Sequence, residues 1–302
     1  MPDQERRKTM ENKVLDKRID MLGFIKVEYA NPNGNPGEGN EPRMLLDGTG
    51  YMTDVSLKYK IRDWIEKKYG DRPGFARFIK SDGITLETKT TERIFEYLIE
   101  KGLTENDLKK NRVSWNMLHQ AMTNVYFDLR MFGGVMTAMS KRKWTDGKIT
   151  GPVQISYAQS LDIITPVNDP ITCASVASDK EKEEDGKEQN MGDKWIVPYA
   201  IYRFEVHVSG CLAEKIGMTE EDLRILTEAI WNMYDVNSTS SKTGIDMEKL
   251  YVFRHDSKLG NCKFAQLRKA IETKADFTKQ EFTAEVHKEL IPDSVELTVM
   301  EN

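Results

Sequence analysis

The stretch Asn31-Pro-Asn-Gly-Asn-Pro36, followed by Asn40-Glu-Pro-Arg43 and Thr53-Asp-Val-Ser-Leu-Lys-Tyr-Lys-Ile-Arg62, decides the fold of this chain. It predicts the end of a strand, a loop rich in Gly, Asn and Pro, and the start of a helix. Such a loop carries few bulky side chains, so we expect it to be flexible. Backbone N–H groups of a loop of this kind, together with a helix N-terminus, are suited to holding phosphate.

The segments on either side of the loop have clear periods. Before the loop, three apolar residues alternate with charged ones, as in a half-buried strand: Ile25, Val27 and Tyr29. After it, four residues spaced three or four apart predict the apolar face of a helix: Leu57, Ile61, Trp64 and Ile65. Lys58 and Arg62 lie together on the flank of that helix, so positive charge is expected beside the loop.

The composition predicts a globular protein in the cytoplasm. The chain has 302 residues, of which 39% are apolar, and its mean hydropathy is -0.59. No run approaches the roughly 18–20 apolar residues that a bilayer span needs, and the first residues lack the apolar core of a secretory signal. Cys173, Cys211 and Cys262 are odd in number and far apart, which is typical of reduced thiols.

The charge distribution is uneven. A net charge of -5 argues at first sight against nucleic-acid binding, which depends on neutralising phosphates. Residues 249–269 nevertheless hold six basic residues against one acid, and residues 130–148 hold five against one. Residues 179–188 hold six acids and three lysines. The two basic segments are compatible with a localised groove and equally with solvated faces.

The remaining periodicity predicts an α+β fold in one elaborated domain. Short strands are expected at 75–80, 84–89, 151–157 and 250–253, helices at 91–101, 104–107 onward and 115–129, and a projecting hairpin at 168–195. Alternation of Tyr202, Phe204, Val206 and Val208 predicts a further strand. Thr219 to Asp222 predicts a helix cap, followed by an apolar stripe of Leu223, Leu226, Ile230 and Met233. This order predicts a ferredoxin-like or RNA-recognition-motif-like antiparallel sheet with helices on one face.

Most catalytic chemistries lack a sequence signature here. The four histidines, His119, His207, His255 and His287, have no metal-ligand spacing, and His207 is expected to be an ordinary surface residue. No nucleophile, Rossmann or Walker pattern is present, so we expect no cofactor. Carboxylates near the loop can form a metal-dependent nuclease site: Glu38, Glu41, Asp47 and Asp54. For Asp54, helix capping is the simpler interpretation.

Nucleic-acid binding has more support. The basic residues that can line one groove with the loop are Lys58, Arg62, Arg130 ahead of Gly133, and the stretch from Arg254 to Lys269 with His255 and Lys258. On the hairpin, Thr172, Met191 and Trp195 can wedge against bases. The alternatives are that the lysines serve solubility and that Trp195 belongs to the core.

Several blocks taken together resemble one family. They are Asn31–Gly34, Pro42–Arg43, Thr53–Arg62, Asp128–Gly133, Val135–Thr137, Gly151–Gln154, Val197–Tyr199, Tyr251–His255 and Leu259–Asn261. In this order they resemble the CRISPR-associated Cas7 family, the guide-RNA-binding backbone subunits of type I surveillance complexes (Cascade). Subtype I-C is the most similar and I-B the second. The resemblance covers Leu22 to Asn261.

The resemblance implies a hand-like protein. It predicts an RNA-recognition-like palm at about 20–70, 125–167 and 196–260, a helical fingers insertion at about 71–124, a thumb hairpin at about 168–195, and a C-terminal extension at about 261–302. It also implies which residues contact the guide backbone: Asn33, Gly34, Arg43, Ser56, Lys58 and Arg62.

The resemblance further implies partners and the absence of catalysis. The partners are the guide RNA (crRNA), the target DNA strand, other copies of the chain, a Cas-five-type guide-end-binding subunit, and large and small subunits. A separate helicase-nuclease cuts DNA, so the chain itself is expected to be noncatalytic. Cys173 and Ala174 stand where an Arg and a Met are expected, and Thr150 stands where a basic residue is expected. The rival hypothesis is a metal-dependent ribonuclease using Asp47 or Asp54, as in type III backbone subunits.

Overall fold

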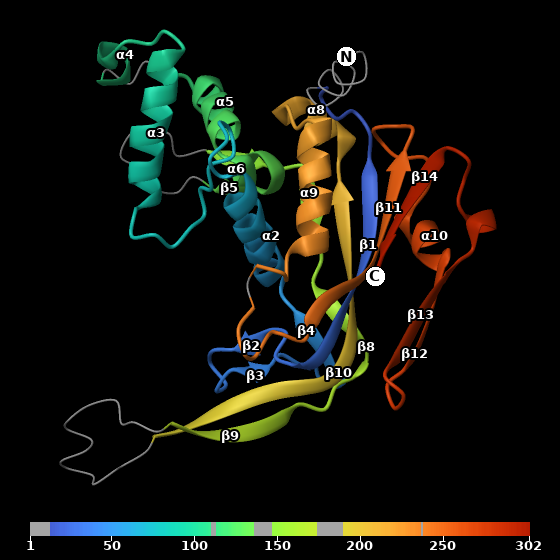
Figure 1. Ribbon diagram of the computed structural model, residues 1–302. Coiled ribbons are helices and arrows are strands. Elements are labelled where there is room, and N and C mark those ends of the chain that lie inside the picture. Colours follow the sequence, from blue (N-terminus) through green and yellow to red (C-terminus); the bar gives the residue numbers. More distant parts are fainter. Residues whose placement is uncertain (1–12, 110–112, 136–146, 174–189, 237) are drawn as a thin grey trace, which may run out of the picture.

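An eight-stranded sheet runs through the molecule (Figure 1). The structure, a computed structural model, describes residues 13–109, 113–135, 147–173, 190–236 and 238–302. Along the main path of the sheet the strands are β14 (Val295–Glu301), β11 (Ile245–His255), β1 (Ile19–Ala30), β10 (Asn190–Val208), β8 (Ala158–Ile163) and β4 (Thr49–Met52). β7 (Val153–Ile155) and β9 (Val167–Cys173) also pair with β10. Every strand pair in this sheet is antiparallel.

The central strand β1 is covered on both faces over most of its length. Residues 19–25 are all buried, so alternation begins only at Lys26. Ile25 and Val27 are buried, as predicted. The prediction for Tyr29 is wrong, because its side chain is 65% exposed. Tyr29 has a φ of 47° and drops out of the pairing between β1 and β10, so the strand turns there and the side chain points to solvent.

Two helices cover one face of the sheet. They are α2 (Asp54–Tyr69) and α9 (Glu220–Asn232), and the largest apolar core lies between them and the strands. The chain runs β1, α2, β7, β10, α9, β11, while the order in space is β11, β1, β10, β7. The prediction of an antiparallel sheet in a mixed α and β fold is confirmed.

Helix α2 begins as its sequence predicts, with one correction. Thr53 is the N-cap, and its side-chain oxygen accepts the N–H of Ser56 at 3.2 Å. The interpretation of Asp54 as the capping residue is therefore wrong: Asp54 is the first helical residue and pairs with Lys58. The predicted apolar face is confirmed, since all four of its residues are buried: Leu57, Ile61, Trp64 and Ile65.

A helical lobe projects beside α2. It contains α3 (Leu86–Glu100), α4 (Glu105–Lys109), α5 (Trp115–Val125) and α6 (Phe127–Phe132), with an apolar cluster of its own. The two short strands predicted at 75–80 and 84–89 are wrong. Thr85 accepts the N–H of Thr88 and so starts α3 there, while Ala76 makes only a single bridge, to Tyr126.

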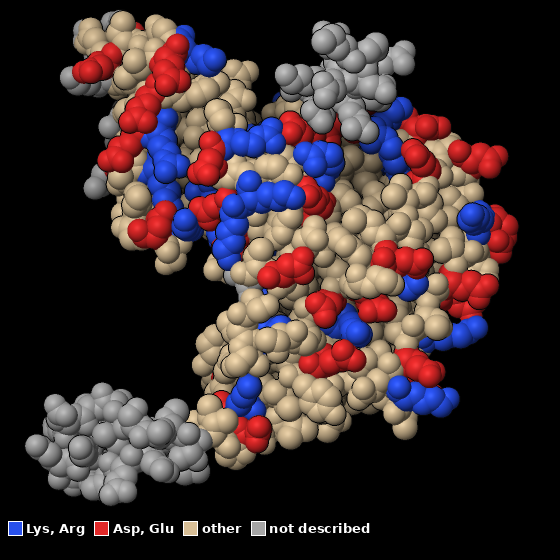
Figure 2. All heavy atoms as spheres, viewed as in Figure 1, with Lys and Arg blue, Asp and Glu red and all other residues tan. Residues whose placement is uncertain are grey.

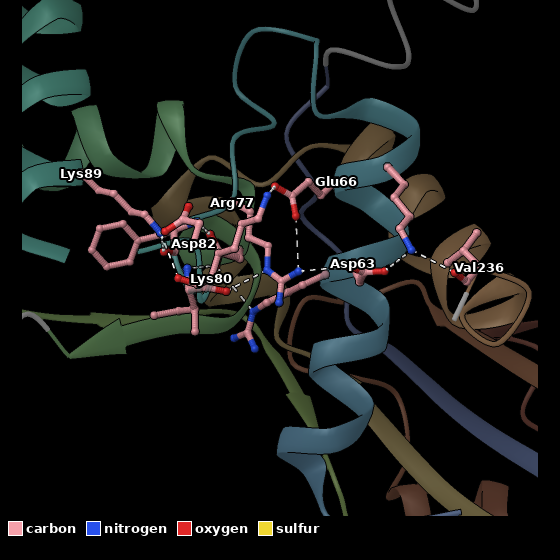
Figure 3. Close-up of polar contacts among 12 residues, drawn as sticks. Asp63, Glu66, Arg77, Lys80, Asp82, Lys89 and Val236 are labelled. Carbon is pink, nitrogen blue, oxygen red and sulfur yellow. Dashed lines mark hydrogen bonds and ion pairs between the residues drawn. The ribbon is translucent and has the colours of Figure 1, made fainter. Parts of the chain in front are cut away.

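Polar contacts fix the loop that leads from α2 into this lobe (Figure 3). Both oxygens of Asp128 accept backbone N–H groups, from Phe78 and Ile79, each at 2.9 Å. Arg77 lies close to Glu66 of α2, at 3.4 Å, and donates to the carbonyl of Ile79 at 2.8 Å. The loop after α2 is therefore fixed by hydrogen bonds and ion pairs rather than by strand pairing.

The C-terminal part of the chain covers the other face of the sheet. It contains α10 (Phe264–Lys269), β12 (Ile271–Asp276), β13 (Glu281–Val286) and the 3-10 turn η2 (Lys288–Leu290). Phe24 of β1 packs there against Tyr251 and Phe282, with ring centroids 6.2 and 5.1 Å away. The centre of this sheet face is consequently closed to any ligand.

A two-stranded hairpin projects from the end of the molecule that lies away from the helical lobe (Figure 1). β9 pairs with the first part of β10, from Val167 with Ile196 to Cys173 with Asn190. The hairpin predicted at 168–195 is thus present in its described part, while residues 174–189, with Ala174, lie outside the described residues. Four short strands and one helix complete the fold: β2 (Gly34–Asn35), β3 (Glu41–Pro42), β5 (Gly133–Val135), β6 (Lys148–Thr150) and α8 (Gly210–Ile216).

Candidate nucleic-acid interface

The loop after β1 is folded by hydrogen bonds of its own. The side chain of Asn31 donates to the carbonyl of Asn40 at 2.8 Å, and β2 pairs with β3 inside the loop. The side-chain oxygen of Asn33 accepts the backbone N–H of Thr53 at 3.0 Å. Asn33 therefore joins the start of the loop to the cap of α2 and fixes their relative position.

Gly34 is required by close packing within this loop. A Cβ atom at this position would lie 2.1 Å from the side-chain oxygen of Asn40 and 2.6 Å from its carbonyl oxygen. Because backbone as well as side chain is in the way, a larger residue would displace the loop.

Lys58 and Ser56 lie at the N-terminus of α2, where the sequence predicts phosphate binding. Lys58 is partly buried, and its ammonium group is 2.9 Å from the carboxylate of Asp54, one turn earlier. The N–H of Ser56 already donates to Thr53. A ligand at this point would therefore have to share Lys58 with Asp54.

Arg43 and Arg62 each have a buried Nε that lacks a hydrogen-bond partner. The Nε of Arg62 lies 3.6 Å from Asp128, and its guanidinium is 4.9 Å from the ring centre of Phe132. Burial lowers the pKa of Arg62, because the charged form loses hydration. No ion pair involving Arg43 is found within the described residues. These two guanidinium groups are incompletely satisfied within the chain, so an anion nearby would stabilise them.

These residues lie between the helical lobe and the hairpin. In Figure 1, α2, β2 and β3 lie between the two projections, and Figure 2 shows the molecular surface hollowed along this side. Hydrogen bonds join Asn33 to Arg43 and to Thr53, the cap of α2, so the loop residues Asn33, Gly34 and Arg43 lie close to Ser56 and Lys58. Arg62 lies one turn further along α2, beside Asp128.

Arg130 must be removed from the predicted interface. Its side chain is buried, and its guanidinium forms a two-pronged pair with Asp222 of α9, at 3.0 and 2.8 Å. The remaining nitrogen donates to the carbonyl oxygens of Gly74 and Thr123. These contacts use four of the five N–H groups of the guanidinium, and the side chain is buried, so Arg130 is poorly placed to bind phosphate. Arg130 connects α6 to α9 instead.

His255 is also a correction. It is buried, its Nε2 lies 2.9 Å from Asp20, and its Nδ1 accepts the N–H of Asn261 at 2.9 Å. His255 ends β11 beside the start of β1, whereas the loop follows the other end of β1. Lys258 is at this far end too, paired with Glu214 at 2.9 Å. The prediction that the 254–269 segment shares one groove with the loop is therefore wrong.

Asp20, which sequence reasoning missed, organises this far end of the sheet. Its carboxylate is fully buried and contacts His255, His207 at 2.6 Å and Arg18 at 3.0 Å. The hydrogen bond that His207 donates to Asp20 raises the pKa of His207 to about 9, with Glu205 contributing. His207 is therefore a charged partner of a buried acid rather than an ordinary surface residue. The available signal was the acid itself, isolated in the apolar run Ile19-Asp-Met-Leu22.

The other predicted residues have simpler positions. Gly133 is buried with a φ of 71°, and a Cβ there would lie 2.2 Å from the carbonyl oxygen of Ile149, so it serves the backbone. Trp195 is half-buried on the hairpin and pairs with Asn168. Thr172 and Met191 pair with each other in the backbone of the hairpin, and their side chains lie outside what the structure describes.

Glu38, Asp47 and Asp54, three of the carboxylates around the loop, each have a different partner within the chain. Glu38 accepts from Asn35 at 2.6 Å, Asp47 accepts the N–H of Thr49 at 2.9 Å, and Asp54 pairs with Lys58. Hydrogen bonds from Thr49 lower the pKa of the exposed Asp47. Within the residues that the structure describes, no group of three or more His, Cys, Asp or Glu side chains is placed to hold a metal ion.

Comparison with known proteins identifies the family. The sequence model of the family described as CRISPR-associated protein Cas7 matches residues 17–291. The chain belongs to the Cas7 family. A Cas7 protein of Haloferax volcanii is 26% identical over 268 residues, which cover 84% of this chain and 75% of that protein.

Chains from two solved structures are similar to this chain. One chain of a CRISPR RNA-guided surveillance complex in a pre-nicking state has a TM-score of 0.48 at 13% identity, covering 87% of this chain and 85% of that one. A second chain, from a CRISPR RNA-guided surveillance complex, has a TM-score of 0.47 at 14% identity, covering 93% and 88%. No helix in the described part of this Cas7 chain is long and apolar enough to cross a bilayer.

Proposed function

We propose that this Cas7 protein is a noncatalytic backbone subunit that binds CRISPR guide RNA in a type I surveillance complex. In this proposal several copies stack head to tail along one guide and present it for pairing with target DNA. Base pairing then supplies the sequence specificity, so the protein has to recognise only the shape and charge of the RNA backbone. An interface that does not close on itself generates the open helix that such a filament needs.

The observation that carries the proposal is the pair of incompletely satisfied guanidinium groups beside the loop. Arg43 and Arg62 each hold a buried Nε without a hydrogen-bond partner, and Lys58 lies on α2 one turn before Arg62. Phosphate oxygens accept from guanidinium in the geometry that a carboxylate would use. Since family membership is established, an RNA backbone is the anion that fits best.

The architecture supports the division into palm, fingers and thumb. The strand order β11, β1, β10, β7 with α2 and α9 on one face corresponds to the RNA-recognition-type palm. The helical lobe corresponds to the fingers, and the β9–β10 hairpin to the thumb. We assign the protein to subtype I-C on its sequence blocks, with I-B second. The partners expected on this basis are a guide-end-binding subunit, large and small subunits, and a recruited helicase-nuclease.

The test measures how guide RNA binding depends on salt concentration. Lys58→Ala and Arg43→Ala should each weaken binding for all guide sequences alike, and each should lower the slope of log K against log salt by about 0.7. Lys68→Ala is the matched control. It lies on the same helix but pairs with Glu228 of α9, so the slope should stay unchanged. If the Lys58 and Arg43 variants keep the wild-type slope, the proposed interface is wrong.

The rival function, a metal-dependent ribonuclease, is tested on the same preparation. The assembled protein is incubated with complementary RNA and Mg²⁺ or Mn²⁺, and the products are resolved by length. The proposed function predicts intact RNA. Regularly spaced cuts that disappear in Asp47→Ala or Asp54→Ala would instead establish the nuclease.

A further inference from the structure

A row of polar and aromatic side chains crosses the uncovered edge of the sheet. Arg43 lies opposite Tyr51, because Met44 bridges to Gly50 and the N–H of Tyr51 donates to the carbonyl of Arg43 at 2.9 Å. Tyr51 of β4 is opposite Gln159 of β8, which is opposite Arg203 of β10. Residues directly opposite in antiparallel strands project from the same face. The four side chains therefore form one line across neighbouring strands.

The face that carries this row is the one opposite α2 and α9. Neighbouring residues with the other orientation, such as Met52 and Ala158, are fully buried in the core beneath those helices. The C-terminal part of the chain covers the opposite face around Phe24 and Tyr199. Phe24 is the β1 partner of Arg203, so Arg203 lies next to the covered part.

Tyr157 extends the row outward by stacking on Tyr51. The two rings are nearly parallel, with an interplanar angle of 8° and centroids 6.0 Å apart. Tyr157 is 56% exposed. A pair of stacked rings with one ring open to solvent is an arrangement on which a further flat ring can stack, because every nucleobase has a π-face.

The arginines at the two ends of the row provide positive charge for the phosphate that accompanies a nucleobase. Within the described residues, neither Arg43 nor Arg203 forms an ion pair with a carboxylate, and the Nε of Arg43 is buried without a hydrogen bond. At the usual strand spacing of about 4.8 Å, Arg203 lies about 10 Å from the tyrosine of the row. Arg43 also belongs to the interface proposed above, so the open sheet edge is continuous with it.

We propose that Tyr51 and Tyr157, flanked by Arg43 and Arg203, form a stacking platform for an unpaired nucleobase and its phosphate. This inference rests on the proposed function and adds a second contact surface to it. The ligand chemistry is that of a single strand, whether a nucleotide of the guide RNA or of a separated DNA strand. The sheet face is used as in other single-strand-binding sheets, but at its edge, because the centre is covered.

The experiment compares three variants of the full-length protein, with single-stranded RNA and single-stranded DNA of one sequence as separate probes. Tyr157→Ala should weaken binding of the preferred strand by about 5- to 150-fold, the range expected for one lost stacking contact, without changing the salt slope. Tyr157→Phe keeps the ring and should bind like the wild type. Arg203→Ala should lower the salt slope by about 0.7. The strand that responds, RNA or DNA, identifies the source of the base.

A photo-cross-link gives a readout independent of affinity. A strand with 5-iodouridine at successive positions, irradiated in the complex and digested, should yield a cross-linked peptide that contains Tyr157. Equal affinity of Tyr157→Ala and wild type for both strands would overturn the inference. So would unchanged affinity with weakened self-association in sedimentation, which would assign the surface to protein contact. Failure of the wild type to bind guide RNA would instead reject the proposed function itself.

Discussion

Replacing Arg130 by methionine tests whether this arginine stabilises the fold or binds RNA. Arg130 and Asp222 are both buried, and the pair is joined by two hydrogen bonds of 3.0 and 2.8 Å. Asp222 also closes the capping box of α9, where its carboxylate accepts the N–H of Thr219 at 2.9 Å. Methionine fills a similar volume but leaves the carboxylate buried without its cation. Breaking a buried pair in this way costs about 3–5 kcal/mol of stability.

The expected change in thermal midpoint follows from chain length. A chain of 302 residues has an unfolding entropy of about 0.6 kcal/mol/K, so the midpoint should fall by about 5–8 °C. Arg254→Met is the matched control. Arg254 forms the same two-pronged contact with Glu220, two residues before Asp222 on α9, but a third of its side chain is exposed. Its loss should cost about 1 kcal/mol or less.

Differential scanning calorimetry measures the thermal midpoints of Arg130→Met and Arg254→Met. The double variant Arg130→Met with Asp222→Asn should recover part of the lost stability, because the uncompensated charge is then gone. Guide RNA binding by Arg130→Met, measured well below its midpoint, should keep the wild-type salt slope. An unchanged midpoint combined with a lower slope would refute the structural assignment and return Arg130 to the RNA interface.

Two further predictions concern the buried carboxylate of Asp128 and the histidine that pairs with the buried Asp20. Asp128→Asn should lower the free energy of unfolding by about 1–3 kcal/mol and increase hydrogen exchange at Phe78 and Ile79. The reason is that both N–H groups donate to carboxylate oxygens, and the asparagine NH₂ group would face one of them with a donor. Unchanged protection at both residues would contradict this role. His207 has its pKa raised from 6.5 to about 9, so its contribution to stability is complete below pH 6.5 and is lost as the pH rises toward 9. Because the side chain is 39% exposed, we expect chemical denaturation to show a loss of about 1–2 kcal/mol over this pH range. This loss should be absent in His207→Gln. An equal pH dependence of stability in that variant would argue against the role of His207.

The parts of the fold predicted correctly are those encoded over short distances. The face of α2, the Thr219–Asp222 capping box and the alternation in β10 depend on residues within a few positions of one another. The strand expected at 84–89 does not form because Thr85 caps α3 by accepting the N–H of Thr88, and the strand expected at 75–80 makes only a single bridge, from Ala76 to Tyr126. Tertiary contacts with α2 and Asp128 set that segment instead.

The candidate site divides in the same way. The residues grouped by the loop and the start of α2 do come together, because hydrogen bonds such as that from Thr53 to Asn33 close over a short segment. Arg130 and His255 were assigned from local charge, yet their partners are residues 222 and 20, distant in sequence. A charge is available for a ligand only if no partner inside the fold takes it, and sequence spacing does not report that.

The sequence by itself determined the family, the sheet-and-helix class and the cluster of residues around the loop, since these depend on local periods and ordered blocks. Only the tertiary structure decided which cations remain available and that Tyr51 stacks on Tyr157, residues more than a hundred positions apart. The physical reason is that strand register, fixed by burial over the entire sheet, sets which distant side chains become neighbours.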